Sequence, residues 1–256
     1  MKRTFIFSLF FVISLNLYSQ NMSDFEIQVV ENFRGIPKGI FITKYVGNNV
    51  TVNIPSTING IPVIGISSGA FSDEVFLKII FPEGILAIYD YAFSYCTYLT
   101  EIIFPKSLGY IGQNAFEACI KLKEITFPEG SAIEVIFSGA FSGCIELEKI
   151  IIPNNSGFVL GVGAFLGCKN LKEVRLPGGL THLYDRVFAY CENLESIYLP
   201  NSVTTIGESA FAYCKKLSVI NLPTSLQNVG KRAFADCALL PPLRLEMERR
   251  FGIGIW

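Results

Sequence analysis

The sequence has almost none of the residues from which catalytic and metal sites are usually built. Its 256 residues include one histidine, His182, and charged side chains make up only 17%. None of the seven cysteines lies in a Cys-x-x-Cys motif, so a zinc site with the usual ligand spacing is not expected. The glycines do not form a phosphate-binding loop. We therefore expect no cofactor, no metal ion and no enzymatic activity.

An excess of charge of one sign is also missing. The formal net charge is −1, and it becomes −3 if Lys2 and Arg3 are removed with the N-terminal segment. Nucleic acids and anionic membranes attract strongly basic proteins. The charge balance therefore argues against either of them as a partner.

His182 is the one candidate for a histidine-based nucleophile pair. It lies in Leu180-Thr181-His182-Leu183, between two positions of core type. A catalytic base is one interpretation, but such a base needs partner residues, and the sequence offers no such set. We favour the alternative, an exposed residue on a strand.

What the sequence does have is a motif of about 23 residues that recurs along most of its length. Its most regular residue is a phenylalanine, and successive copies lie 22 to 25 residues apart, at Phe71, Phe93, Phe116, Phe141, Phe165, Phe188, Phe211 and Phe234. A cysteine follows three residues after each of them except the first, at Cys96, Cys119, Cys144, Cys168, Cys191, Cys214 and Cys237. A period of this length indicates a solenoid whose copies stack on one another.

Each copy continues into an apolar-x-apolar-Pro segment, such as Ile220-Asn221-Leu222-Pro223. Two apolar residues that are two positions apart share one face of a strand, and the residue between them faces the other way. Proline cannot donate a hydrogen bond to a central ladder, so the strand ends there. The segment therefore predicts one short strand in each turn.

The complete pattern, C-x-x-L-x-x-I-x-L-P-x-S-L-x-x-I-G-x-x-A-F-x-x-C, resembles the BspA-like class of leucine-rich repeats over about residues 48 to 240. The resemblance implies a right-handed coil with a parallel sheet on one face and short strands or helical turns on the other. It also implies a bacterial surface or secreted protein with a role in adhesion or protein binding. No catalytic residues come with this family.

The N-terminal segment, residues 1–19, is predicted to be a secretory signal peptide. Lys2 and Arg3 precede an apolar run from Phe5 to Leu17, which is shorter than the roughly 20 residues of a membrane span. An uncleaved membrane anchor is the alternative. After cleavage we expect no membrane insertion, and a location at the cell surface, outside the cell or in the periplasm.

Three further segments complete the expected organisation. Residues 20–53 contain two β-rich runs separated by Gly35, Pro37 and Gly39, which predict a hairpin that caps the first turn. Residues 54–240 form the solenoid. In residues 241–256, two prolines precede Leu243, Met247 and Phe251 at helical spacing, which predicts a capping helix. A disordered tail is the alternative for this last segment.

Seven cysteines in a secreted chain could form disulfides, but all seven occupy the same position of the repeat. They should therefore form one row of side chains that point inward in parallel. We expect buried free thiols that act as small hydrophobic groups.

The residues that face outward from the predicted strands form the candidate ligand-binding face. Two positions before the proline lie Ile80, Ile103, Thr126, Ile151, Arg175, Tyr198 and Asn221. Four positions before it lie, among others, Glu101, Glu124, Lys149 and Glu173. An apolar stripe beside charged residues is typical of a contact surface. The alternatives are simple β-propensity at these positions and a face covered by the N-terminal hairpin. Tyr95, Tyr190 and Tyr213 form a second possible stripe, which packing alone could also explain.

These features predict a secreted, β-rich, monomeric solenoid that binds a protein or an extracellular-matrix ligand through its sheet face. The alternative is a structural or periplasmic assembly part without a catalytic role, whose ends matter more than its face. The outward residues vary freely within the repeat, so the sequence does not name the ligand.

Overall fold

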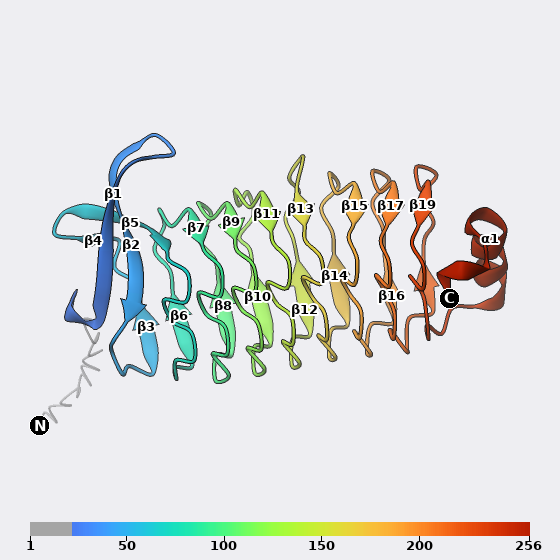
Figure 1. Ribbon diagram of the computed structural model, residues 1–256, viewed down its shortest axis with the longest axis horizontal. Helices are drawn as coiled ribbons and strands as arrows, with labels where there is room; N and C mark the ends of the chain where they lie inside the picture. The colour runs from blue at the N-terminus through green and yellow to red at the C-terminus, as the bar shows by residue number, and fades with distance from the viewer. Residues whose placement is uncertain (1–21) are drawn as a thin grey trace, which may run out of the picture.

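Each copy of the motif forms one turn of a long solenoid, and successive turns stack along its axis (Figure 1). The computed structural model describes residues 22–256, so the expected signal peptide lies outside the described residues. A hairpin lies at one end of the solenoid and a helix at the other. The predicted β-rich solenoid with a parallel sheet is confirmed.

The apolar-x-apolar-Pro segments form the first sheet, called sheet I. In the three-residue strands from β3 to β12 the central side chain is buried and its neighbours face outward, as Lys78 and Ile80 do around Ile79, whereas the central Val174 of β14 is only partly buried. Equivalent residues of successive turns lie opposite one another in parallel register, so Glu124 pairs with Glu101 on one side and with Lys149 on the other. The strands are β3 (Thr51–Asn53), β6 (Lys78–Ile80), β8 (Glu101–Ile103), β10 (Glu124–Thr126), β12 (Lys149–Ile151), β14 (Glu173–Arg175), β16 (Ser196–Ile197) and β18 (Val219–Ile220).

A second side of each turn contributes a shorter strand to sheet II. Most of its strands have two residues: β7 (Ala87–Ile88), β9 (Tyr110–Ile111), β11 (Val135–Ile136), β13 (Val159–Leu160), β15 (His182–Leu183), β17 (Thr205–Ile206) and β19 (Asn228–Val229). The first members are longer: β1 (Phe25–Phe33), β2 (Ile36–Tyr45) and β5 (Ile61–Ile66). A small strand, β4 (Thr57–Ile58), pairs antiparallel with β5 through a turn at Asn59 and Gly60.

The Ala-Phe segments form the third side and the centre of the core. The eight phenylalanine rings stack in one continuous column, with centroids 4.8 to 5.7 Å apart between neighbours. The backbone pairs along the same column, as the Phe93 N–H donates to the carbonyl oxygen of Ala115 at 2.7 Å. These rings are fully or almost fully buried, so the apolar surface that they remove from water stabilises the stack of turns.

The two ends of the phenylalanine column are covered by different elements. At the N-terminal end, β1 and β2 form an antiparallel hairpin, and the Tyr45 ring stacks on Phe71 with centroids 5.2 Å apart. The hairpin joins sheet II, because β2 pairs in parallel with β5, and it therefore leaves sheet I uncovered. Sheet I begins with β3, which pairs with β6 and lies within residues 20–53, the range assigned to the cap.

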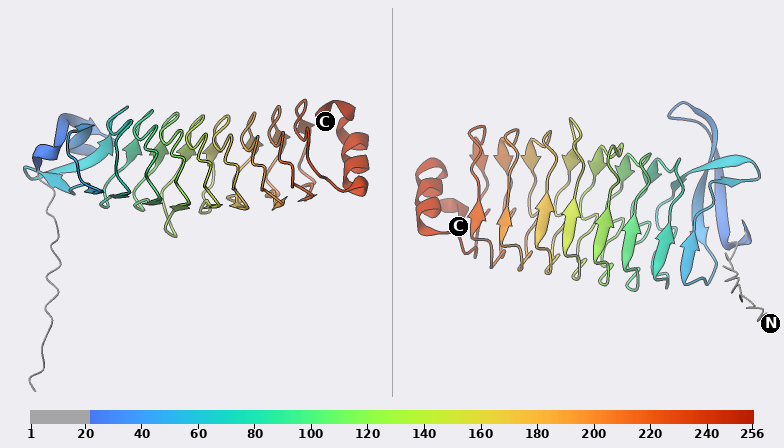
Figure 2. Two further views of the ribbon diagram at one scale, coloured as in Figure 1. Left: turned by 90° about the horizontal axis from the view of Figure 1, so that it is seen from below. Right: turned by 180° about the vertical axis from the view of Figure 1, so that it is seen from behind.

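At the C-terminal end, the predicted helix is present as α1 (Pro241–Phe251). Its Met247 is fully buried, and Leu243 and Phe251 pack partly buried against the core. Short 3₁₀ turns lie at both ends of the described chain, η1 (Met22–Asp24) and η2 (Ile253–Ile255). The views in Figure 2 show α1 closing the end of the stack opposite the hairpin. Among residues 22–256, no helix has the length and apolar character needed to span a membrane.

Candidate ligand-binding face

The outward residues of sheet I form one row that runs along the solenoid, called the outer row. Ile80 and Ile103 are 45% and 49% exposed, and the Tyr198 ring is 67% exposed. Thr126 and Arg175 are also exposed, and Ile151 is half-buried. Ile80 and Ile103 lie next to each other on two directly paired strands, β6 and β8, so they form a continuous apolar stripe at the N-terminal end of the face.

The last member of the predicted row, Asn221, is engaged within the chain. Its side-chain amide donates to the carbonyl oxygen of Leu199 at 2.8 Å, and its side-chain oxygen accepts from the N–H of Leu199 at 2.6 Å. These two bonds let the side chain take the place of a backbone partner at the end of β16.

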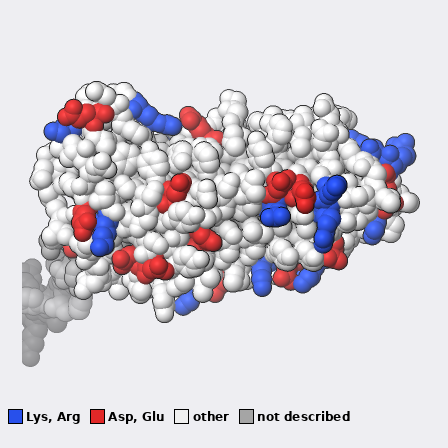
Figure 3. Space-filling view, viewed as in Figure 1, with Lys and Arg blue, Asp and Glu red and all other residues white. Residues whose placement is uncertain are grey.

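A second row, called the charged row, flanks the outer row four positions before each proline. Lys78 pairs with Glu101 at 3.5 Å, and Lys149 pairs with Glu173 at 3.1 Å, each across two adjacent turns. Such exposed pairs stabilise a fold by at most about 1 kcal/mol. Figure 3 shows that acidic and basic groups are interspersed over the visible face, with wide uncharged areas between them.

Two charged residues of these rows remain without an ion pair or side-chain hydrogen bond within residues 22–256. They are Glu124 on β10 and Arg175 on β14, and both are exposed. The sequence places both residues on the face but does not reveal which charges pair with each other. That distinction depends on the side-chain geometry across adjacent turns.

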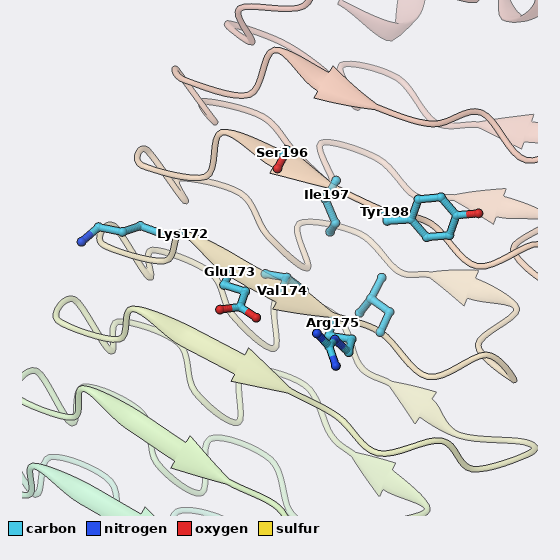
Figure 4. Close-up of a pocket in the computed structure, with 8 residues that line it drawn as sticks. Lys172, Glu173, Val174, Arg175, Ser196, Ile197 and Tyr198 are labelled. Carbon is cyan, nitrogen blue, oxygen red and sulfur yellow. The ribbon is translucent and has the colours of Figure 1, made fainter.

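Three shallow hollows follow one another along this face. The first, of about 280 Å³, lies against Ile80 and Ile103. The second, of about 560 Å³, lies against Ile151 and Arg175. The third, of about 360 Å³, has Arg175 and Tyr198 among its lining residues. The second and third hollows therefore share Arg175 in their lining. In Figure 4 the side chains of Glu173 and Arg175 both project from β14, while the Tyr198 ring extends away from the end of β16.

The third hollow lies at a break in the solenoid that the sequence does not announce. Sheet I pairs continuously from β3 to β14 and resumes with β16 and β18, and sheet II is interrupted at the same turn, between β13 and β15. In the described chain, no backbone hydrogen bond joins residues 173–176 to residues 196–199. The phenylalanine column continues through the break, with Phe165 and Phe188 stacked at 5.6 Å.

The cysteines lie in the predicted inward row and are free thiols. Each Sγ donates to the carbonyl oxygen of a phenylalanine in the preceding turn, as Cys144 does to Phe116 at 3.2 Å. Burial raises the pKa of the Cys144 and Cys191 thiols well above the usual range, and it raises the pKa of the less buried Cys237 to about 12. Protonated, buried thiols are poor nucleophiles and poor metal ligands, so this row supports packing.

His182 is an exposed residue on β15, as predicted. Its Nδ1 lies 2.9 Å from the hydroxyl of Thr181, and its ring stacks on Tyr184 with centroids 5.9 Å apart. Within residues 22–256 there is no group of three or more histidine, cysteine or carboxylate side chains placed to hold a metal ion.

The tyrosines of the second predicted stripe are only partly brought together. Tyr190 and Tyr213 stack with centroids 4.5 Å apart, and Arg232 donates to the Tyr213 hydroxyl at 3.2 Å. Tyr95 lies several turns away and does not join them.

The repeat is also found by comparison with known proteins. A family model of the BspA type leucine rich repeat region matches residues 64–159 and 134–245, in six copies. The chain belongs to this family. BspA-type repeat proteins of bacteria are typically surface or protein-interaction modules and are not known as enzymes. None of the curated proteins that were searched matches the chain.

Three solved bacterial structures show how this BspA-type chain compares with others. The leucine rich repeat protein TpLRR of T. pallidum is 28% identical, with 90% of this chain and 94% of that chain covered and a TM-score of 0.69. A leucine-rich repeat protein of Eubacterium ventriosum is 24% identical, with 79% and 48% covered and a TM-score of 0.57. The pneumococcal vaccine antigen PcpA is 22% identical, with 86% and 74% covered and a TM-score of 0.52. The last two likenesses concern the fold alone.

Proposed function

We propose that the protein binds a macromolecular ligand, a protein or a component of the extracellular matrix, through the outer row of sheet I. The observation that carries this proposal is the exposure of Ile80 and Ile103 on adjacent strands of a face that no other element of residues 22–256 covers. Contiguous exposed apolar side chains beside polar ones are typical of protein contact surfaces. Secretion to the cell surface, with adhesion as the outcome, is the setting in which such a face would act.

The test uses the full chain after the N-terminal segment, applied to cultured cells and to surfaces coated with purified matrix proteins. The double variant Ile80→Asp with Ile103→Asp should bind at least tenfold more weakly than the unmodified protein, with an unchanged circular dichroism spectrum. Val159→Asp is the matched control, because Val159 is 42% exposed on sheet II. Equal binding by the double variant and the control would contradict the placement of the ligand on sheet I.

A structural role without a face ligand is the second candidate, and the C-terminal end favours it. Leu245 and Ile253 lie there and are 66% and 79% exposed, so this end presents apolar side chains that self-association would cover. If the ends associate, light scattering should show oligomers at micromolar concentrations that Leu245→Asp with Ile253→Asp converts to monomers. A monomer at all concentrations would remove this candidate.

Cleavage by protease added to intact producing cells tests the location. Fragments from residues 78–221 released from intact cells support display at the surface. Complete protection until the envelope is opened supports a periplasmic location and the structural role.

A further inference from the structure

The sheet I face carries one anionic and one cationic position that its own residues leave unpaired. Lys149 is the register partner of Glu124, but its Nζ lies 3.1 Å from Glu173 on the other side. On its remaining side Glu124 faces Glu101, another carboxylate, which is paired with Lys78. Like charges directly opposite each other on neighbouring strands destabilise a sheet. Glu124 therefore stands where a positive group supplied from outside would be stabilised.

Arg175 presents the opposite charge further along the same face. It is exposed, it has no ion pair among the described residues, and it lines two neighbouring hollows. Tyr198 lines the same hollow from the next turn. A guanidinium group binds a carboxylate through two parallel hydrogen bonds, and an exposed tyrosine ring adds apolar contact area beside them. This end of the face therefore suits an acidic side chain of a partner.

The separation of the two positions defines the form of the occupant. Glu124 and Arg175 lie two turns apart and two residues apart along the strand direction. With strands about 4.8 Å apart and residues about 3.3 Å apart along each strand, the two positions are separated by roughly 12 Å. An extended chain covers this distance in about four residues, and residues i and i+4 of such a chain point to the same side.

We propose that the face binds an extended segment of a partner protein that carries a basic residue and an acidic residue four positions apart. The basic residue lies at Glu124, and the acidic residue lies between Arg175 and Tyr198. Ile103 and Ile80 lie to one side of the line that joins these positions, so an apolar part of the same partner beside the segment packs on them. This inference rests on the proposed function and gives the chemistry of the protein partner. The charges select the partner, and the apolar stripe supplies the contact area.

The test is selection of displayed random octapeptides on the immobilised full chain. The unmodified protein should enrich peptides with opposite charges at positions i and i+4, in one consistent order. The charge-swapped variant Glu124→Arg with Arg175→Glu should enrich the reverse order with similar apolar content. A synthetic peptide from the first selection should bind the swapped variant at least tenfold more weakly than the unmodified protein.

A matched control exchanges two exposed charges on the side of sheet II. Glu134→Arg with Arg186→Glu changes the same number of charges two turns apart, and it should leave the selected sequences unchanged. Identical peptides from the unmodified and swapped proteins, or no charge order in either selection, would overturn the inference. Loss of cell or matrix binding in the Ile80→Asp, Ile103→Asp variant without any effect of the charge swap would overturn this inference alone. The reverse result would contradict the proposed apolar stripe instead.

Discussion

At the residue scale, each Ala-Phe segment depends on two residues with left-handed backbone. One precedes the alanine and the other precedes the cysteine, and the second position is held by Ala118 with φ 56° and by Gly143 with φ 73° in the next turn. A side chain at such a position destabilises the backbone by about 1–2 kcal/mol, whereas glycine adopts it freely. The two glycines at equivalent positions, Gly143 and Gly167, therefore relieve strain that other turns retain.

Ala118→Gly should stabilise the protein by about 0.5–1 kcal/mol, although glycine usually destabilises. The relief of left-handed strain exceeds the greater flexibility that glycine gives the unfolded chain. The midpoint of urea unfolding measures the effect. Ala132→Gly, in an exposed loop whose φ is not positive, is the control and should be neutral or slightly destabilising. If Ala118→Gly were no more stable than the Ala132→Gly control, this account would be contradicted.

The thiol row gives the protein an unusual dependence on pH. Burial raises the pKa of these thiols in the folded protein, while in the unfolded chain they titrate near about 8.5. At pH below about 8.5 the thiols are protonated in both the folded and the unfolded state, so their titration does not make stability depend on pH. Above that pH the unfolded chain loses protons that the folded chain keeps, so unfolding becomes more favourable.

Stability should therefore be retained up to about pH 8.5 and fall steeply above it. Each buried thiol contributes a loss of about 1.4 kcal/mol per pH unit. Urea unfolding at pH 7, 8.5 and 9.5 measures the slope, and Cys144→Ala with Cys168→Ala should make it shallower. A slope that does not change in this variant would show that other groups cause the alkaline loss. In native protein, Cys237, with its pKa raised to about 12 and its partial exposure, should be alkylated first.

At the element scale, the break between β14 and β16 has a steric explanation in the turn that follows it. Val187 is fully buried where all other copies have alanine. Tyr184 is the equivalent of Gly207 in the next turn. A Cβ added at Gly207 would lie 2.6 Å from the backbone nitrogen of Asp185, one turn back, so this position has little room for a side chain when neighbouring turns pair. Phe137 occupies the same position without a break, but its turn keeps Ala140. We attribute the break to the two enlarged positions acting together.

Tyr184→Gly with Val187→Ala should close the break. Restored pairing would protect the backbone amides of residues 174–176 and 182–184, and their hydrogen exchange should slow at least tenfold. Hydrogen exchange measured by mass spectrometry is the readout. The equivalent residues of β10 and β11, which already pair on both sides, are the internal control. Unchanged exchange at the break, with the control also unchanged, would show that the two side chains do not cause it.

The strands and helix could be predicted because each one repeats a local rule. Pro105 and Pro128 mark strand ends, and Leu243, Met247 and Phe251 mark the buried side of α1. Glu246 and Arg250, four residues apart on the same helix, form an ion pair at 3.8 Å. The break could not be predicted, since Val187 alone reads as a slightly larger apolar residue. Whether neighbouring turns pair depends on how the side chains of both turns fit together, which the sequence of a single turn does not show.

At the scale of the whole molecule, a stack of turns must be closed at both ends. The last residues of the chain substitute for a further turn at the C-terminal end. The Phe234 N–H donates to the carbonyl oxygen of Ile255 at 2.9 Å, and the Trp256 ring lies 6.1 Å from the Phe234 ring. Arg244 of α1 lies over the same tryptophan ring, with 4.5 Å between its Cζ and the ring centroid.

Removal of residues 252–256 should destabilise the protein by about 2–5 kcal/mol. Phe234 would lose its apolar cover, and buried Ile255 would be lost with it. Thermal and urea unfolding measure the change. Ile253→Ala, at a highly exposed position in the same segment, should change stability by less than about 0.5 kcal/mol. Equal stability of the shortened and full-length chains would assign the closure to α1 alone.

The candidate face illustrates the limit of sequence reasoning at this scale. The repeat placed Ile80, Ile103 and Arg175 on one side of the molecule, and the structure gives all three exposed side chains. The repeat pattern in the sequence could not show that Asn221 bonds to the backbone of Leu199. Nor could it show that Lys149 pairs with Glu173, which leaves Glu124 without an ion pair among residues 22–256. Those outcomes depend on side-chain reach across adjacent turns.

The direction of the hydrogen bonds determines how the molecule would respond to mechanical force. Bonds between turns lie along the long axis, so a pull between the hairpin and α1 loads the turns in series. A series of links yields first at its weakest member, and the turn boundary after β14 is held by the Ala-Phe side without either ladder. Tension would therefore open the solenoid there first, as a hinge on the phenylalanine side, at the hollow that Arg175 and Tyr198 line.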